Sequence, residues 1–327
     1  MGHQHQSWWA RLRQWFGLRT ELAARFATMK FSVWPNPSQS PAEVLRLAQM
    51  AEADGWYGFW YADHYMSNTD TAETARGDVH ECWAMLPAVA ATTERIRIGS
   101  LVAPTSVHHP AVLANRAVTI DHISNGRMVL GIGAGWQINE HAAYGIDLEP
   151  PKERVSRFDE AIQVMSSLLG EDETSFDGDF YTLTGAPSDP APVQAPLPIL
   201  VGTGSPRMLR ITARHAQEWN TWGDPTLVAQ GVAKLETACE QVDRDPATMW
   251  KSVQALVVQT GDDNTDDMGD RVIAGSPAQL VDQIGRYEEL GIDEFIVADF
   301  LFGEDEDVRL DTYRRFNEEV ISQAGGQ

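Results

Sequence analysis

An acidic residue and a histidine, Asp63-His64, stand together directly after the apolar run at residues 57–61. An imidazole gains or loses a proton near neutral pH, so a histidine here can act as the acid or base that accompanies a hydride transfer. The alternative is a histidine whose ring nitrogens only hydrogen-bond within the fold. We predict that Asp63 and His64 are catalytic.

Two glycine-rich segments are candidates for holding a cofactor. The first follows the apolar run at residues 128–132 and consists of Gly133, Ala134, Gly135 and Trp136. Backbone that carries few side chains lets a flat ligand approach closely. The second segment precedes Pro206 and consists of Gly202, Thr203, Gly204 and Ser205. Its N–H groups and hydroxyl stand at the start of a predicted helix, where a phosphate binds favourably. The alternative is that Ser205 only caps this helix.

The remaining histidines do not indicate a metal site. His108-His109 and His141 have no carboxylate or cysteine at the spacing of known metal-ligand sets. We interpret them as loop and helix-start residues and predict no metal ion. A serine hydrolase is also disfavoured, because the sequence contains no G-x-S-x-G elbow.

Composition narrows the classes of partner. The chain has 327 residues and a formal net charge of −22, which argues against a nucleic acid or an anionic membrane as the partner of its main body. Cys82 and Cys239 lie far apart and form neither a disulfide framework nor a zinc spacing, so we expect a cytoplasmic protein. No apolar run reaches the length of a transmembrane helix. A small-molecule substrate fits these limits, and a homodimer is left open.

The elements that must position these residues repeat along the chain. Apolar runs predict strands at residues 30–34, 57–61, 96–102, 128–132, 198–201, 218–221, 250–258 and 295–298, each followed by a helical pattern. Such alternation predicts a parallel sheet covered by helices, and eight repeats close a (β/α)₈ barrel. The alternative is an open doubly wound sheet, which typically carries a G-x-G-x-x-G turn after its first strand. The sequence there is Trp-Pro-Asn-Pro, so the barrel is favoured.

Local signals set the expected ends of the helices. Ser40-Pro41, Asp224-Pro225 and Ser276-Pro277 predict helix starts, and Gly126 predicts a left-handed helix end. Pro87 predicts that the helix near residues 82–92 starts or kinks there. An insertion at residues 171–196 follows the helix after the fourth strand, and its Asp177-Gly178 predicts a hairpin turn. The acidic residues at 262–267 are interpreted as a solvated loop.

The first 28 residues differ from the rest. They are basic and place Trp8, Leu12, Trp15, Leu22 and Phe26 at helical spacing. One interpretation is a helix that binds a membrane surface or a partner, and the other is a non-native extension before a natural start at Met29. We therefore divide the chain into an extension at 1–28 and a single barrel domain at 29–327.

Three motifs in chain order carry a family resemblance. They are A-D-H at residues 62–64, G-A-G-W…E…Y-G from residue 133 to residue 145, and G-T-G-S-P at residues 202–206. From about residue 30 to its end the chain resembles the luciferase-like superfamily, most closely the branch that depends on the deazaflavin coenzyme F420. The resemblance implies the barrel fold, a D-H pair that faces cofactor and substrate, and a cofactor phosphate near Gly202–Ser205. It also implies a non-prolyl cis peptide at Ser100-Leu101 that supports the cofactor ring.

The active site of such a barrel lies at the C-terminal ends of its strands. The expected pool is Trp34, Asn36, Asp63, His64, Asp299 and the residues at 100–105, 133–136, 202–205 and 220–222. Similar sugar-phosphate dehydrogenases carry an acidic residue where this chain has Trp136, which favours a hydrophobic substrate. The first rival function is an FMN-dependent monooxygenase on the same fold. A second rival, from another class, is a catalytically silent cofactor-binding protein.

Overall fold

The computed structural model of the chain describes residues 29–260 and 269–323. Within these residues, eight parallel strands close into a barrel. In order around the ring they are β1 (Lys30–Trp34), β2 (Gly58–Tyr61), β3 (Arg97–Ser100), β5 (Met128–Gly133), β8 (Ile199–Gly202), β9 (Glu218–Trp222), β10 (Trp250–Gln259) and β12 (Glu294–Ala298). The ring is closed because β1 pairs with both β2 and β12. The predicted (β/α)₈ barrel is confirmed, and the open sheet is excluded. The extension at 1–28 and the acidic loop at 262–267 lie outside the described residues.

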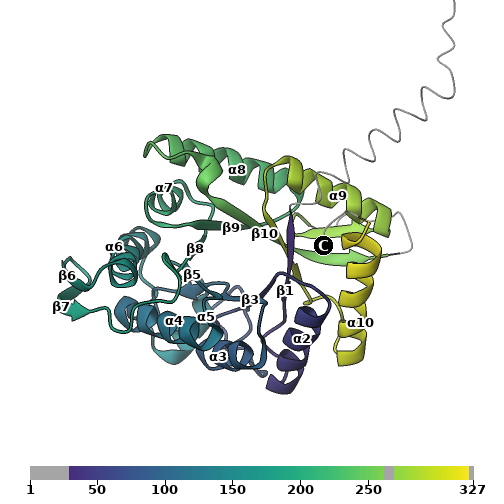
Figure 1. Cartoon of the computed structure of the whole chain (residues 1–327), viewed down its shortest axis with the longest axis horizontal. Helices are drawn as coiled ribbons and strands as arrows, with labels where there is room; N and C mark the ends of the chain where they lie inside the picture. Colours follow the sequence, from purple (N-terminus) through teal and green to yellow (C-terminus); the bar gives the residue numbers. More distant parts are fainter. Residues whose placement is uncertain (1–28, 261–268, 324–327) are drawn as a thin grey trace, which may run out of the picture.

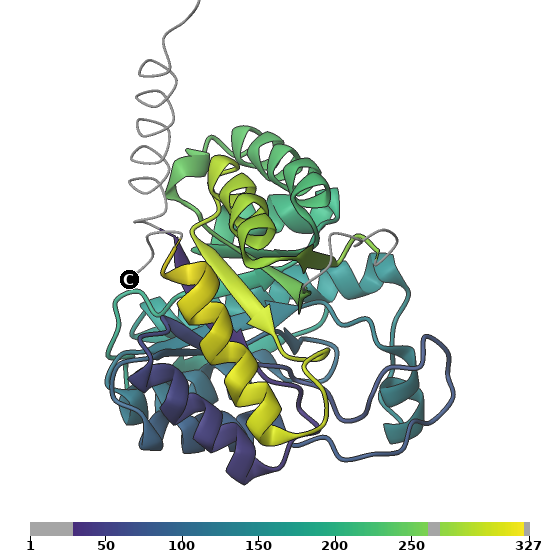
Figure 2. The ribbon, with the colours of Figure 1, turned by 90° about the vertical axis from the view of Figure 1, so that its right-hand side faces the viewer.

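Helices cover the outside of the strands (Figure 1). They are α2 (Pro41–Ala53), α3 (Cys82–Thr92), α4 (Pro110–Ser124), α6 (Pro151–Gly170), α7 (Pro206–His215), α8 (Pro225–Glu240), α9 (Pro277–Glu289) and α10 (Glu306–Phe316). Figure 2 shows α10 beside α2, where Arg46 pairs with Glu306. The outer helices that follow β1 and β12 are therefore in contact, just as β1 and β12 pair with each other.

The predicted helix boundaries are largely confirmed. Ser40 begins α2 with a capping box, and Asp224 caps α8 through the N–H of Leu227. The predicted range of α3 is confirmed, and of the two alternatives at Pro87 a helix start there is excluded. The helix starts at Cys82, because the Glu81 side chain accepts a hydrogen bond from the N–H of Ala84, and Pro87 lies inside the helix.

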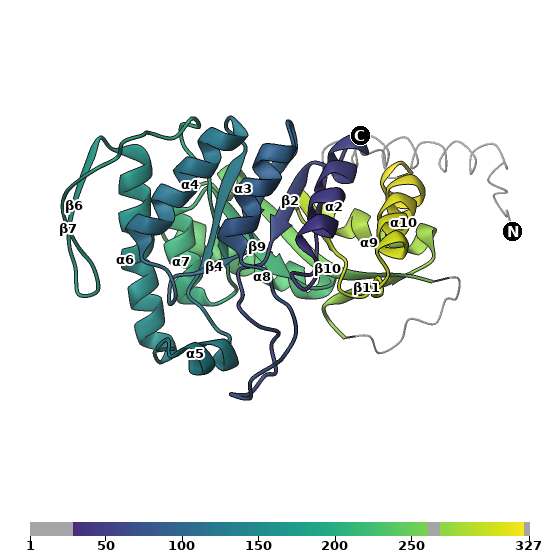
Figure 3. The ribbon, with the colours of Figure 1, turned by 90° about the horizontal axis from the view of Figure 1, so that it is seen from below.

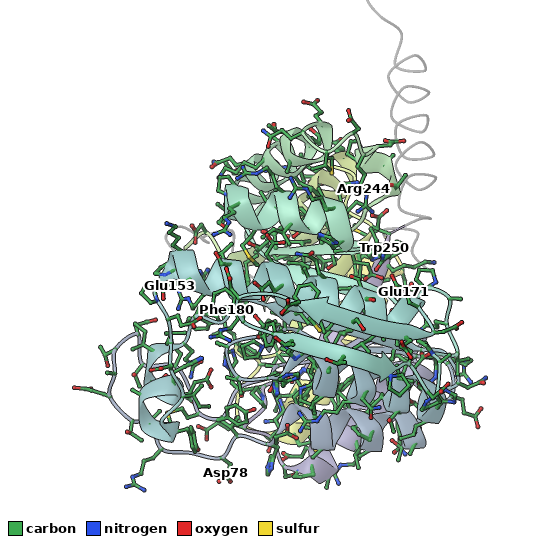
Figure 4. All side chains as sticks on the ribbon, turned by 90° about the vertical axis from the view of Figure 1, so that its left-hand side faces the viewer. Asp78, Glu153, Glu171, Phe180, Arg244 and Trp250 are labelled. Atoms are coloured by element: carbon green, nitrogen blue, oxygen red, sulfur yellow. The ribbon has the colours of Figure 1, made fainter. Side chains whose placement is uncertain are left out.

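The insertion after α6 forms the hairpin β6 (Glu173–Asp177) and β7 (Thr182–Pro187). Asp177 pairs with Thr182, so the connection spans residues 178–181 and the predicted two-residue Asp-Gly turn is wrong. The physical reason is the Glu160 carboxylate on α6, which accepts hydrogen bonds from the N–H groups of residues 179, 180 and 181. Figure 4 shows the hairpin running along α6, with Phe180 nearer the Glu153 end of that helix.

The N-terminal end of the barrel is closed by a buried polar network. The Glu294 carboxylate, which is 0% exposed, accepts hydrogen bonds from the indoles of Trp60 at 2.6 Å and Trp250 at 3.1 Å. Arg97 pairs with Glu218 beside it. A cavity of about 320 Å³ borders this network and is lined by residues at strand starts, such as Trp250. It lies at the opposite end of the strands from the predicted site.

Candidate active site

The predicted site residues meet at the C-terminal rim of the barrel. His64 follows β2, Ser100 ends β3, Gly133 ends β5 and Gly202 ends β8. Because the strands are parallel, all these ends lie on one face. In Figure 3 this rim faces the bottom of the picture, where the short helix α5 (Ile138–Tyr144) lies beside the loop that follows β2. In Figure 4 the rim is on the left, and Asp78, near the end of that loop, lies at the lower left.

Asp63 and His64 have different partners although they are adjacent in sequence. The Asp63 carboxylate is 0% exposed, and its Oδ2 accepts a hydrogen bond from the Trp83 indole at 2.7 Å and lies 2.7 Å from Nε2 of His108. Nδ1 of His64 instead lies 3.0 Å from Oε1 of Glu140. The two side chains therefore do not form a unit, and His64 is the one that keeps partial exposure, at 24% of its side chain.

Sequence reasoning missed the roles of His108 and Glu140. His109 is the N-cap of α4, as predicted for a helix-start residue, but His108 is buried against Asp63. Glu140 is 1% exposed and also accepts a hydrogen bond from the N–H of Tyr65 at 2.9 Å. The signal for Glu140 was the acid inside the motif that runs from residue 133 to residue 145.

The non-prolyl cis peptide lies between Leu101 and Val102, one bond later than expected. The expected position at Ser100-Leu101 is wrong, because Ser100 is the last residue of β3 and Leu101 still donates to the neighbouring strand. The Ser100 hydroxyl donates to the carbonyl of Gly131 at 2.8 Å, and the N–H of Leu101 donates to the carbonyl of Tyr61 at 2.8 Å.

Val102 explains two of the predicted glycines. A Cβ atom at Gly133 would lie 2.9 Å from Cγ2 of Val102, and one at Gly202 would lie 3.2 Å from its Cγ1. Both glycines therefore make room for the half-buried Val102 side chain at the rim. Gly204 differs, because a Cβ there would meet no atom within 4 Å.

The second glycine segment leads into α7 with its hydroxyl unused. Ser205 is the N-cap of this helix, but its side chain makes no capping hydrogen bond. The alternative that Ser205 only caps the helix is therefore not supported by its geometry. Arg207, in the first turn, donates to the carbonyl of Lys152 at 3.1 Å and to the Ser156 hydroxyl at 2.9 Å, so its guanidinium is tied to α6.

Aromatic side chains border the rim. Trp34 packs against Trp222 and Phe300, with ring centroids 5.2 and 4.8 Å apart. Trp136 meets the His64 imidazole edge-to-face at 5.6 Å and is 56% exposed. These aromatic side chains form an apolar wall of the rim beside the partly exposed imidazole of His64.

Asp299, at the end of β12, is a buried acid beneath this wall. Its carboxylate accepts hydrogen bonds from the N–H of Asn36 and the amide of Gln39, both at 2.7 Å. Burial raises the pKa of Asp299 to about 6, although these hydrogen bonds oppose the shift.

In residues 29–260 and 269–323, no three His, Cys, Asp or Glu side chains gather closely enough to hold a metal ion. Over the same residues, no helix is both long and apolar enough to cross a membrane.

Comparison with known proteins assigns the chain to a family. The chain is 31% identical over 217 residues to an F420-dependent glucose-6-phosphate dehydrogenase of Amycolatopsis mediterranei (strain U-32), a match that covers 62% of this chain and 63% of that relative. The chain thus spans less than two thirds of the relative's length.

Solved structures share the fold at low identity. An F420-dependent secondary alcohol dehydrogenase in complex with an F420-acetone adduct superposes with a TM-score of 0.76 at 18% identity, over 90% of this chain and 99% of that one. The EDTA monooxygenase of Chelativorans sp. BNC1 gives 0.75 at 15% identity, over 91% and 93% of the two chains. These likenesses show the barrel fold alone. The profile of one family, described as luciferase-like monooxygenase, matches residues 24–265. Because this match covers most of the sequence, the chain belongs to the luciferase-like monooxygenase family.

Proposed function

We propose that this protein is an F420-dependent oxidoreductase that transfers a hydride between the deazaflavin and a small, apolar organic substrate. The observation that carries the proposal is the sharing of one rim by three features. These are the partly exposed imidazole of His64, the small-residue segment after β5, and the Ser205 hydroxyl, which makes no capping hydrogen bond. The F420-dependent name of the relative from Amycolatopsis mediterranei supports the same choice.

The polar atoms of the rim fit a large ring system with a polar edge. Two buried atoms at strand ends have no hydrogen-bond partner among the residues that the structure describes: Nε1 of Trp34 and Oγ1 of Thr105. A buried polar atom without a partner costs about 1–3 kcal/mol, so such atoms in a native fold call for a ligand or a water. In this proposal Ser100, Leu101 and the segment Gly133–Trp136 support the ring.

The segment Gly202–Ser205 would hold the cofactor phosphate. N–H groups at the start of α7 and the unused Ser205 hydroxyl are donors, and the helix dipole favours an anion there. Both F420 and FMN carry a phosphate, but the F420 chain continues beyond it. Gly204 is exposed and has open space around its Cα, which gives a longer tail room to leave the barrel. This favours F420.

The protein's own residues supply binding and proton transfer. Bound F420 supplies a ring carbon that gives or takes a hydride. His64 would hold or return the proton of the substrate oxygen, and the wall that includes Trp136 would exclude water and bind the apolar part of the substrate. An exposed indole beside His64 is poorly suited to a sugar phosphate, so we propose an apolar alcohol or carbonyl compound.

Turnover of F420 tests this proposal. The purified protein is incubated with F420 and a panel of alcohols from short alkanols to aryl alcohols, with glucose 6-phosphate as the polar comparison, and the loss of F420 absorbance is followed. We expect activity with apolar alcohols and little with the sugar phosphate. Binding of F420 without turnover of any alcohol, or of the matching carbonyl compounds when reduced F420 is supplied, would favour the catalytically silent binding protein.

An FMN-dependent monooxygenase is the second candidate. The family's description and the shared fold with EDTA monooxygenase favour it. Oxygen-dependent turnover with FMN, and none with F420, would establish it instead.

A further inference from the structure

The short helix α5 is tied to the loop that carries His64. Side chains from one end of α5 to the other reach four consecutive residues of that loop. The contacts are Glu140 to His64 Nδ1 at 3.0 Å and to the Tyr65 N–H at 2.9 Å, Gln137 to the Met66 carbonyl at 2.8 Å, Asn139 to the Ser67 carbonyl at 2.8 Å, and Tyr144 to the Tyr65 carbonyl at 3.3 Å. The loop therefore takes its position from α5.

Helix α5 is also anchored on a second side. Nδ1 of His141 lies 2.7 Å from the carbonyl of Gln137, which can only accept, so Nδ1 carries the proton. Nε2 of His141 then accepts from the Ser106 hydroxyl at 2.8 Å, in the segment after the short strand β4 (Ala103–Pro104). Because His141 is 1% exposed, this anchor is protected from water. The helix is held independently of His64.

The contacts of Glu140 define which ring nitrogen of His64 is protonated. Oε2 faces the N–H of Tyr65, which can only donate, so this carboxyl group presents acceptors. The ionised carboxylate has no proton to give, so Oε1 requires a proton on Nδ1 of His64, and the neutral imidazole then has its remaining lone pair on Nε2. The carboxylate is almost fully buried, so water does not compete for these bonds.

We propose that Glu140 is a positioning residue that holds His64 as the Nδ1–H tautomer, leaving Nε2 as the atom that exchanges the proton with the substrate. The last step rests on the proposed oxidoreductase function, whereas the tautomer itself does not. Helix α5 is not part of the ring of strands, yet in this proposal it determines which ring nitrogen of His64 carries the proton.

Glutamine at this position gives a sharp prediction. In Glu140→Gln the amide oxygen satisfies the Tyr65 N–H only if the NH₂ group turns toward His64. The imidazole must then accept at Nδ1 and carry its proton on Nε2. The substitution should therefore invert the tautomer while keeping the size of the side chain.

Nitrogen NMR of ¹⁵N-histidine-labelled protein tests the tautomer without cofactor or turnover. Spectra are recorded near pH 8.5, about two units above the ordinary histidine pKa of 6.5, and the His64 signals are identified by their loss in His64→Ala. We expect Nδ1–H in the wild type and Nε2–H in Glu140→Gln. Tyr144→Phe, which removes a tether of the same helix without touching His64, should keep Nδ1–H. A wild-type protein with Nε2–H, or a Glu140→Gln protein that keeps Nδ1–H, would overturn the proposal. The wild-type result decides even if the glutamine variant does not fold.

A double-mutant cycle then tests whether Glu140 acts through His64. Glu140→Gln should lower kcat about 100-fold, at the lower end of the range for losing an acid–base group, with a similar KM and cofactor Kd. In a His64→Ala background it should cause no further loss. Equal losses in both backgrounds would show that Glu140 acts independently of His64. A protein with no F420 turnover at all would contradict the proposed function but leave the NMR result standing.

Discussion

Nε2 of His108 lies 2.7 Å from Oδ2 of Asp63, in a pair that is closed to solvent. The same oxygen accepts a hydrogen bond from the Trp83 indole. This arrangement separates the two members of the Asp63-His64 motif. Asp63 is fixed in the interior by α3 and by the start of α4, whereas His64 is turned toward α5 and the rim.

Stability should distinguish Asp63 from His64. Asp63→Ala leaves the His108 and Trp83 donors buried without an acceptor, so we expect a loss of about 3 kcal/mol in the free energy of unfolding. His64→Ala removes one donor from the buried Glu140 carboxylate, which keeps the N–H of Tyr65, so we expect a smaller loss of about 1–2 kcal/mol. Urea denaturation of both variants measures the difference. Equal losses would show that the buried pair of Asp63 and His108 contributes no more to the free energy of unfolding than His64 does.

Turnover, unlike stability, should depend strongly on His64. His64→Ala is expected to lower kcat by about 10²–10⁴-fold, the usual contribution of a general acid–base group. Cofactor affinity should change far less, because the proposed ring and phosphate contacts come from other segments. Steady-state kinetics and cofactor titration of the same preparation check this. Near-wild-type kcat in His64→Ala would remove His64 from the mechanism.

Substitutions at Gly202 and Gly204 should separate the effect of added charge on F420 affinity from the effect of added side-chain volume. A Cβ at Gly202 would be 3.2 Å from Val102, whereas one at Gly204 would meet no atom within 4 Å. Gly202→Asp adds both a Cβ and a carboxylate near the proposed phosphate, so we expect at least a tenfold rise in the Kd of F420, since 1.4 kcal/mol corresponds to tenfold. Gly202→Ala isolates the steric part, and Gly204→Ala should be neutral. Unchanged affinity in Gly202→Asp would place the phosphate elsewhere.

Asp299 should make stability depend on pH in a defined direction. Burial raises its pKa to about 6 from the model-peptide value of 3.8, so the folded protein binds this proton more tightly than the unfolded chain does. Stability contributed by this group is therefore greatest below about pH 4 and falls as the pH rises to about 6. Relative to Asp299→Asn, the wild type should lose on the order of 2 kcal/mol over that range. Denaturation curves of both proteins at pH 4.5, 5.5 and 7, chosen around these values, measure it. A constant difference would contradict the raised pKa.

The sequence predicted the scaffold better than the partners of its side chains. Most strands are apolar runs, and six of the eight helices outside them begin with a capping side chain. Both signals are local, so even β1 was placed at its observed bounds. The contact between His64 and Glu140 joins residues 76 positions apart, and no local pattern encodes it. The hairpin turn failed for a related reason, because Glu160 on another element sets the loop. The cis peptide, which the family resemblance placed one bond too early, follows the end of β3, where Ser100 pairs with Tyr61 on β2, and that pairing is not encoded locally.

The choice between F420 and FMN is the central claim, and direct titration tests it. Cofactor-free protein is titrated separately with F420 and FMN, and binding is followed by the fluorescence of each cofactor. The arrangement of Gly133–Trp136, Gly202–Ser205 and the open space at Gly204 predicts that F420 binds with at least a tenfold lower Kd than FMN. Retention of FMN through purification, with no detectable binding of F420, would contradict the account and assign the rim to a flavin.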